Sequence, residues 1–294
     1  MQGSYTALIT PFGREGGINY KALKKIIVFQ STSGMTGLVP GGTTGENPTF
    51  SEDEFRELYS FVCSVCIELG MKVIAGCGSS STEKAAKLCR MASDCGADAA
   101  LVITPYYNKP NQEGLFRHFS KIADSSPIPV VMYNVPSRTG VNMLPETVER
   151  LSFHENICAL KEASGSMSQV QKIIFSVEGR ISILSGEDDL TYSMMALGGK
   201  GVISVSSNII PKQMSSLVKA MLENDYEKGL SLSKYVNDIC AAMFIDTNPI
   251  PVKAALNMMG FDAGSPRLPL VDLDESKTAK LKKLLEKYNL TEKK

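Results

Sequence analysis

Eight short, almost continuously apolar runs rich in β-branched residues are the feature that most constrains how this chain folds. Strands of a parallel sheet have this pattern because both of their faces are covered, whereas strands with one wet face alternate between apolar and polar residues. The runs cover residues 5–10, 36–39, 72–76, 99–103, 129–134, 157–161, 181–184 and 201–205. The pattern therefore predicts a buried parallel sheet.

Segments with helical periodicity separate the apolar runs. Ser51 and Glu54 form the capping box that begins the helix predicted over residues 52–69. Further helices are predicted over residues 20–31, 82–93, 112–123, 145–151, 168–177, 190–197 and 211–222. Strand and helix alternate, which implies parallel pairing through right-handed crossovers. Eight such units predict an α/β fold of the closed (β/α)8 TIM-barrel type, with an open doubly wound sheet as the alternative.

The strand pattern stops after the last of these helices. Residues 226–244, 252–259 and 276–288 all have helical patterns, and no Gly-, Ser- or Pro-rich linker precedes them. We therefore expect residues 1–224 to form a catalytic barrel and residues 225–294 to form a helical extension packed on it.

Charge and length exclude several classes of function. The 294 residues include 31 basic and 31 acidic side chains, so nothing points to nucleic acid or to an anionic membrane as a partner. No apolar run reaches membrane-spanning length, and the first residues lack a signal-peptide pattern. We expect a soluble cytoplasmic protein.

The cysteines and histidines offer little material for a metal site. The chain has 7 cysteines and 2 histidines. Cys63 and Cys66 form a C-x-x-C spacing, but they lie inside a predicted helix with no second pair beside them, so we interpret them as small buried hydrophobic residues. We expect neither disulfides nor a bound metal.

Polar and reactive residues follow the apolar runs, where a barrel places its active site. These segments are 41–46 (GGTTGE), 104–108 (TPYYN), 133–140 (YNVPSRTG), 161–165 (KEASG) and 185–188 (SGED). The carboxyl ends of all barrel strands meet on one rim, so we expect these segments to lie close together.

Lys161 is the most informative residue of this set. Most lysines are solvated surface charges, but Lys161 ends the apolar run over residues 157–161. Desolvation at the end of a barrel strand is costly for an ammonium group and lowers its pKa. The resulting neutral amine attacks carbonyl carbons and forms an iminium, which draws electrons from the adjacent carbon. Lys161 is therefore a candidate Schiff-base nucleophile.

Three neighbouring segments supply candidate partners for Lys161. Tyr133 ends the preceding run and is either a core aromatic or a proton shuttle. Thr43 and Thr44 lie in a glycine-rich turn that is either a plain tight turn or a carboxylate site. Arg138, in a proline-containing loop, is either a surface residue or a carboxylate ligand. No Gly-Lys-Ser/Thr follows the turn, which disfavours a phosphate loop.

Together these segments resemble the dihydrodipicolinate synthase / N-acetylneuraminate lyase family. The resemblance rests on residues 42–46, 104–110, 133–140, 161–165 and 248–253 (NPIPVK), in order, and it extends over the whole chain. It is nearest to the synthase branch, a group of lyases that condense pyruvate with L-aspartate 4-semialdehyde in lysine and diaminopimelate biosynthesis. The alternatives are another pyruvate aldolase of the family, acting on N-acetylneuraminate or a keto-deoxy sugar acid, and a non-catalytic paralogue that binds a keto acid.

The resemblance implies catalytic roles for four residues. Lys161 would form the imine with pyruvate, without any further cofactor, and Tyr133, Thr43 and Tyr107 would form a proton relay. In this family the residue at the position of Tyr107 reaches into a neighbouring subunit's site. The resemblance therefore implies a homo-oligomer, commonly a homotetramer built as a dimer of dimers.

The resemblance also implies residues that bind the substrates. Thr44 would bind the pyruvate carboxylate, and Arg138 would bind the carboxylate of the semialdehyde. Gly186 and Ile203 would line the pyruvate pocket. Sialic acid lyases of the family usually lack an arginine at the position of Arg138, so this residue favours the semialdehyde over a sugar.

One departure from the family concerns feedback inhibition. Lysine-sensitive members bind L-lysine near the positions of Glu52, Phe55, Ser80, Lys84 and Tyr106. The ammonium group of Lys84 would repel that of the ligand, so we expect weak or absent inhibition by L-lysine. A steady-state inhibition titration checks this, and half-inhibition at submillimolar L-lysine would contradict it.

Overall fold

Eight parallel strands close into a barrel in the order β1 to β8, in a computed structural model that describes residues 1–291. The strands are β1 (Gly3–Ala7), β2 (Gly37–Val39), β3 (Lys72–Gly76), β4 (Ala99–Ile103), β5 (Val130–Asn134), β6 (Ile157–Glu162), β7 (Ser182–Ser185) and β8 (Gly201–Ser204). β1 pairs with β8 and closes the sheet. This confirms the (β/α)8 barrel and rules out the open doubly wound sheet.

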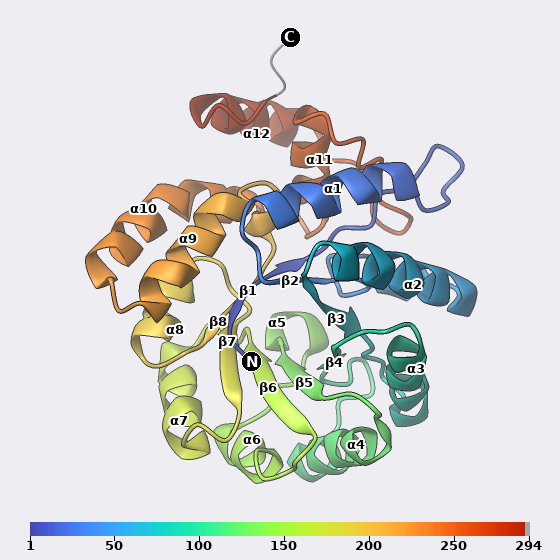
Figure 1. Ribbon diagram of the computed structural model, residues 1–294, viewed down its shortest axis with the longest axis vertical. Coiled ribbons are helices and arrows are strands. Elements are labelled where there is room, and N and C mark those ends of the chain that lie inside the picture. Colours follow the sequence, from blue (N-terminus) through green and yellow to red (C-terminus); the bar gives the residue numbers. More distant parts are fainter. Residues whose placement is uncertain (292–294) are drawn as a thin grey trace.

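Helices surround the barrel, as Figure 1 shows. They are α1 (Tyr20–Thr32), α2 (Glu52–Glu68), α3 (Thr82–Asp94), α4 (Gln112–Ser125), α6 (Pro145–Leu151), α7 (Met167–Val177), α8 (Thr191–Ala196) and α9 (Pro211–Leu222). The capping box is present at α2, where Ser51 accepts from the Glu54 amide and the Glu54 side chain accepts from the Ser51 amide. The one-turn helix α5 (Pro136–Thr139) and the 3-10 turns η1 (Asn47–Thr49) and η2 (Ser206–Asn208) were not predicted. Such short elements have no measurable periodicity.

Two predicted elements begin two residues later than the observed ones. β1 spans Gly3–Ala7, whereas the apolar run covers residues 5–10, because residues 8–10 continue past the paired segment. The helix predicted over residues 252–259 is α11 (Ile250–Met258) and begins two residues earlier. Pro251 lies in its first turn, where the missing N–H has no helical partner to lose.

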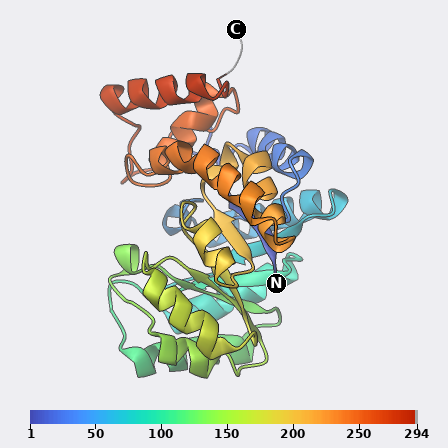
Figure 2. The same ribbon diagram turned by 90° about the vertical axis from the view of Figure 1, so that its left-hand side faces the viewer.

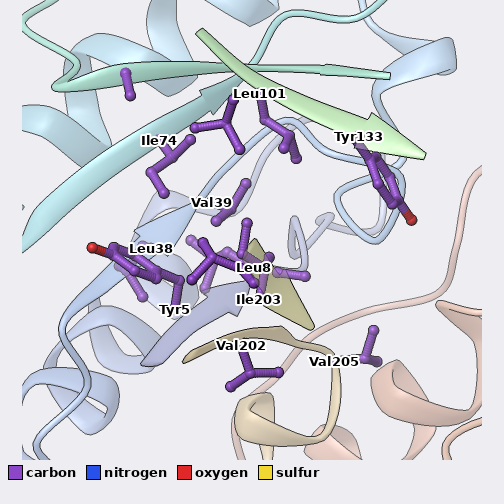
Figure 3. Packing of buried hydrophobic residues seen from close by; sticks show 14 of the residues in the cluster. Tyr5, Leu8, Leu38, Val39, Ile74, Leu101, Tyr133, Val202, Ile203 and Val205 are labelled. Atoms are coloured by element: carbon purple, nitrogen blue, oxygen red, sulfur yellow. The ribbon is translucent and has the colours of Figure 1, made fainter. Parts of the chain in front are cut away.

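Apolar side chains fill the barrel interior and the layer between the strands and the helices. Figure 3 shows part of this cluster, with Leu38, Ile74 and Ile203 pointing into it and the Tyr133 hydroxyl at its edge. Cys63 and Cys66 are buried on α2, as expected, and burial raises the pKa of each thiol to about 12. Within residues 1–291 no helix is long and apolar enough to cross a membrane.

The chain after the barrel is helical and packs against it. α10 (Tyr226–Ala242) packs on α9 and α8, and α11 packs on η2 and on α12 (Glu275–Lys287). Figure 2 shows α10 (orange) against the barrel and the last helices (red) together at the top of the view. We refer to the segment from Tyr226 onward as the C-terminal extension.

A buried ion pair joins the C-terminal extension to the barrel. Lys253 Nζ lies 2.8 Å from Glu46 Oε1, and the two side chains are 1% and 2% exposed. Lys253 Nζ also donates to the Thr10 carbonyl, and the Arg267 amide donates to Glu46 Oε2. Both charges are thus compensated by hydrogen bonds, which a buried pair requires.

Removing one partner of this pair should destabilise the protein strongly. We expect Lys253→Ala to lower the free energy of unfolding by about 3–5 kcal/mol, because the Glu46 carboxylate then stays buried without a counter-charge. Denaturant unfolding followed by circular dichroism measures the loss. The matched control is Lys87→Ala, which breaks the exposed pair with Glu52 and should change stability little. Equal losses in both variants would contradict this account.

Candidate active site

Lys161 lies one residue before the end of β6, with its side chain 5% exposed. Its Nζ is 4.2 Å from the centroid of the Tyr133 ring, because β5 and β6 pair with Tyr133 opposite Lys161. Burial lowers the pKa of Lys161 to about 8; the charge of Asp188 opposes this shift and that of Arg138 adds to it. About a tenth of the amine is therefore neutral at pH 7, far more than for a lysine with the ordinary pKa.

Glu162, the next residue of β6, points to the opposite side of the strand from Lys161. Its carboxylate accepts hydrogen bonds from Asn134 Nδ2 at 3.1 Å and from the Ser164 amide at 2.9 Å. Gln169 on α7 also donates to it. This buried network joins the ends of β5 and β6 and so fixes the direction in which Lys161 points.

Tyr133 is 7% exposed, and burial raises the pKa of its phenol to about 12. The charge of Arg138 and the Thr43 side chain oppose this shift, while the charge of Glu187 adds to it. The phenol therefore stays protonated at neutral pH and is able to donate a proton or a hydrogen bond.

The glycine-rich turn after β2 carries Thr43 and Thr44 into the site. It packs directly against β3, where a Cβ on Gly76 would lie 2.2 Å from the Gly41 carbonyl oxygen. Thr44 is buried, and its Oγ1 accepts a hydrogen bond of 2.9 Å from Asn248 Nδ2. The turn is thus held from the barrel side and from the C-terminal extension.

Arg138 lies on the short helix α5, which begins with Pro136. Its Nη2 donates to the Asn248 carbonyl oxygen at 3.1 Å. Arg138 is an exposed residue, and it also lines the same cavity as Lys161.

A cavity of ≈ 670 Å³ brings most of the predicted residues together. Its lining includes Thr43, Thr44, Tyr133, Arg138, Lys161 and Gly186. The backbone of Gly186 lies against the lysine, since a Cβ there would be 3.1 Å from Lys161 Cε. This volume suits a small metabolite.

Two predicted residues do not line this cavity. Ile203 on β8 is fully buried in the apolar cluster. Tyr107 is 94% exposed and has a positive φ of 71°. Its neighbour Tyr106 lines a smaller cavity of ≈ 170 Å³ that also touches Thr43, Tyr133 and Arg138.

Asp188 is a residue that sequence reasoning did not select. It follows β7 and is 4% exposed, and its Oδ2 accepts a 2.7 Å hydrogen bond from the Ser206 amide. Its Oδ1 has no hydrogen-bond partner within residues 1–291. Burial raises the pKa of Asp188, and donors on Ser204 and Ser206 and the charge of Lys161 oppose the rise. Its only sequence signal was its place after an apolar run.

No group of three or more histidine, cysteine, aspartate or glutamate side chains that could hold a metal ion occurs within residues 1–291. The polar groups that line the cavity include the Lys161 amine, the Tyr133 phenol, the threonine hydroxyls and the Arg138 guanidinium.

A closed barrel with a buried lysine in a polar cavity at the carboxyl ends of its strands defines an enzyme of the (β/α)8 class. The chain belongs to the dihydrodipicolinate synthetase family, whose model matches residues 1–288.

Relatives and solved structures agree with this assignment. A 4-hydroxy-tetrahydrodipicolinate synthase from Citrifermentans bemidjiense is 47% identical, over 98% of this chain and 99% of that protein. The crystal structure of dihydrodipicolinate synthase from Aquifex aeolicus superimposes with a TM-score of 0.97 at 42% identity and covers 100% of both chains. A monomeric dihydrodipicolinate synthase variant has a TM-score of 0.96 at 39% identity, covering 99% of this chain and 97% of the other.

The influence of Asp188 on Lys161 is testable without substrate. We expect Asp188→Asn to lower the pKa of Lys161 further below its usual value, because the carboxylate that stabilises the ammonium is removed. The pH dependence of Lys161 carbamylation by cyanate, followed by mass spectrometry, reports the neutral amine. Asp189→Asn removes the adjacent, exposed carboxylate and is the matched control. An unchanged profile for Asp188→Asn would contradict the interaction.

Proposed function

We propose that this enzyme condenses pyruvate with L-aspartate 4-semialdehyde to give 4-hydroxy-tetrahydrodipicolinate and water, through a Schiff base on Lys161. The observation that carries the proposal is the buried Lys161 amine, with its pKa lowered to about 8, beside the protonated phenol of Tyr133. Membership of the dihydrodipicolinate synthetase family supports the choice of substrates. The reaction belongs to lysine and diaminopimelate biosynthesis, which takes place in the cytoplasm.

The first half of the reaction forms the covalent intermediate. The neutral Lys161 amine attacks the keto carbon of pyruvate, whose carboxylate is held by Thr44 with Thr43. Tyr133 protonates the carbinolamine hydroxyl, and water leaves to give the iminium. The iminium itself is the electron sink, so no further cofactor takes part in this step. Transfer of a methyl proton to the Tyr133 phenolate then gives the enamine nucleophile and restores the phenol.

The second half forms the carbon–carbon bond. The enamine attacks the aldehyde of the second substrate, whose carboxylate Arg138 binds. The amino group of that substrate then attacks the imine carbon, closes the ring and releases Lys161 as a free amine. Gly186 leaves room beside Lys161 for the adduct, because a larger residue would contact Lys161 Cε.

Trapping the imine is the direct test. Borohydride reduction in the presence of pyruvate should add reduced pyruvate to the peptide that contains Lys161, as seen by mass spectrometry. Lys161→Ala should give no adduct and should lower kcat by roughly 10³-fold or more, because the nucleophile is lost. Absence of an adduct on the wild-type protein would overturn the Schiff-base proposal.

The acceptor is tested in the same preparation. L-aspartate 4-semialdehyde should be turned over in preference to N-acetylmannosamine, and Arg138→Ala should lower kcat/KM for the semialdehyde about 10- to 100-fold through loss of charge-assisted hydrogen bonds. Arg150→Ala, which removes an exposed arginine paired with Glu113, is the matched control. Preference for the sugar would identify a sialic acid lyase instead.

We further propose that the enzyme is a homo-oligomer in which Tyr107 completes the proton relay of a neighbouring subunit. The exposure of this tyrosine and its position outside its own cavity support this proposal. A homotetramer of two tight dimers is the arrangement expected from the family.

Subunit mixing tests the role of Tyr107. Tyr107→Phe and Lys161→Ala should each be nearly inactive alone. Co-refolded heterodimers carry one complete site, so the mixture should regain about a quarter of wild-type activity. Light scattering checks that dimers have formed. Dimers that regain no activity would contradict the exchange of Tyr107.

Weak or absent inhibition by L-lysine stays a prediction. Two features of the surface near the expected site support it. Lys84 is exposed, and the Glu52 carboxylate is already engaged by Lys87 at 2.7 Å.

A further inference from the structure

Asn248 lies between α10 and α11 in the C-terminal extension, far along the chain from the strands that carry the nucleophile. It is 5% exposed and lines the cavity that contains Lys161. The contacts of Asn248 with other residues of the cavity indicate its role.

Asn248 contacts the two residues expected to bind the substrate carboxylates. Its side-chain Nδ2 donates to Thr44 Oγ1 at 2.9 Å. Its backbone carbonyl oxygen accepts from Arg138 Nη2 at 3.1 Å. One residue of the C-terminal extension thus joins the glycine-rich turn after β2 to the helix after β5.

The direction of the first hydrogen bond matters chemically. A threonine hydroxyl has one hydrogen to donate and two lone pairs that accept. Because Thr44 Oγ1 accepts from the Asn248 amide, its own hydrogen remains available to a substrate carboxylate. Threonine is also stiff about χ1, so fixing Oγ1 fixes the direction of the side chain.

The turn that carries Thr44 is anchored independently of Asn248. Glu46, two residues further on, is held by Lys253 at 2.8 Å and by the Arg267 amide at 2.8 Å. Thr10 Oγ1 donates to the Gly45 carbonyl oxygen at 2.9 Å. Loss of the Asn248 side chain should therefore release the Thr44 hydroxyl but leave the backbone of the turn in place.

We propose that Asn248 is a positioning residue that sets the Thr44 hydroxyl as a hydrogen-bond donor to the carboxylate of the 2-oxo acid. Its backbone carbonyl meanwhile holds one nitrogen of Arg138 and leaves the others for the second substrate. Asn248 thereby links the carboxylate sites of the two substrates. This inference rests on the proposed function, since it assumes that pyruvate occupies the cavity.

The test compares steady-state kinetics of Asn248→Ala, Thr44→Val and the double variant. Asn248→Ala should raise KM for pyruvate about 5- to 10-fold, the effect of one lost hydrogen bond, with kcat nearly unchanged. In the Thr44→Val background the same substitution should add almost nothing, because the hydroxyl it orients is gone. KM for the semialdehyde should change little, since the backbone carbonyl that holds Arg138 is retained.

Two further variants separate positioning from stability. Asn257→Ala removes side-chain hydrogen bonds to Gly264 elsewhere in the C-terminal extension, so it should lower Tm without raising KM for pyruvate. Asn248→Asp keeps the shape of the side chain but has only acceptors. It should turn the Thr44 hydrogen away from the substrate and raise KM for pyruvate more than the alanine does. It also decides the question if the alanine variant does not fold.

The outcomes are distinct. An unchanged KM for pyruvate in Asn248→Asp would overturn the positioning role. So would an equal rise in KM when Asn248→Ala is introduced into the wild-type protein and into Thr44→Val. Failure of the wild-type protein to form a pyruvate adduct would instead overturn the proposed function on which this inference rests.

Discussion

The desolvation of the Lys161 amine is the constraint on which the site depends. Burial lowers its pKa to about 8, which keeps part of it neutral and nucleophilic. The barrel buries this amine, and the charge of the Asp188 carboxylate opposes the lowering of its pKa. A full counter-ion contact would hold the lysine as an ammonium. One oxygen of Asp188 accepts from the Ser206 amide, and the charge of Asp188 offsets only part of the effect of burial on the lysine pKa.

The site combines residues on strands with residues on the connections between strands and helices. Lys161 and Tyr133 lie on paired strands, where the sheet fixes their separation. The expected carboxylate ligands lie on connections, which are mobile unless something holds them. Here the C-terminal extension holds them, through Asn248 at Thr44 and Arg138 and through Lys253 at Glu46. The extension is therefore part of the site's geometry even though the nucleophile lies on the barrel.

Sequence reasoning recovered the strands well because a buried parallel strand is a continuous apolar run. This run is visible in the sequence whichever strands it pairs with. Once eight such runs were found, the residues after them had to share one rim, so Lys161, Tyr133, Thr43, Thr44 and Arg138 were correctly expected to lie together. The helix α5 and the network of Glu162 were not foreseen. A one-turn helix has no period, and a hydrogen-bond network depends on distances that no local pattern encodes.

The sequence by itself determined the alternation of strands and helices, the helical extension and the candidate site residues, because hydrophobic periodicity and residue type are local properties of the chain. Only the tertiary structure decided how those side chains behave. The lowered pKa of Lys161 depends on the depth of burial and on Asp188, and the orientation of Thr44 depends on Asn248, 204 residues away along the chain. The tertiary structure also separated Tyr107, which is exposed, from the cavity that Lys161, Tyr133 and Thr43 line. Desolvation and hydrogen bonding act between atoms close in space, and only the folded chain brings those atoms together.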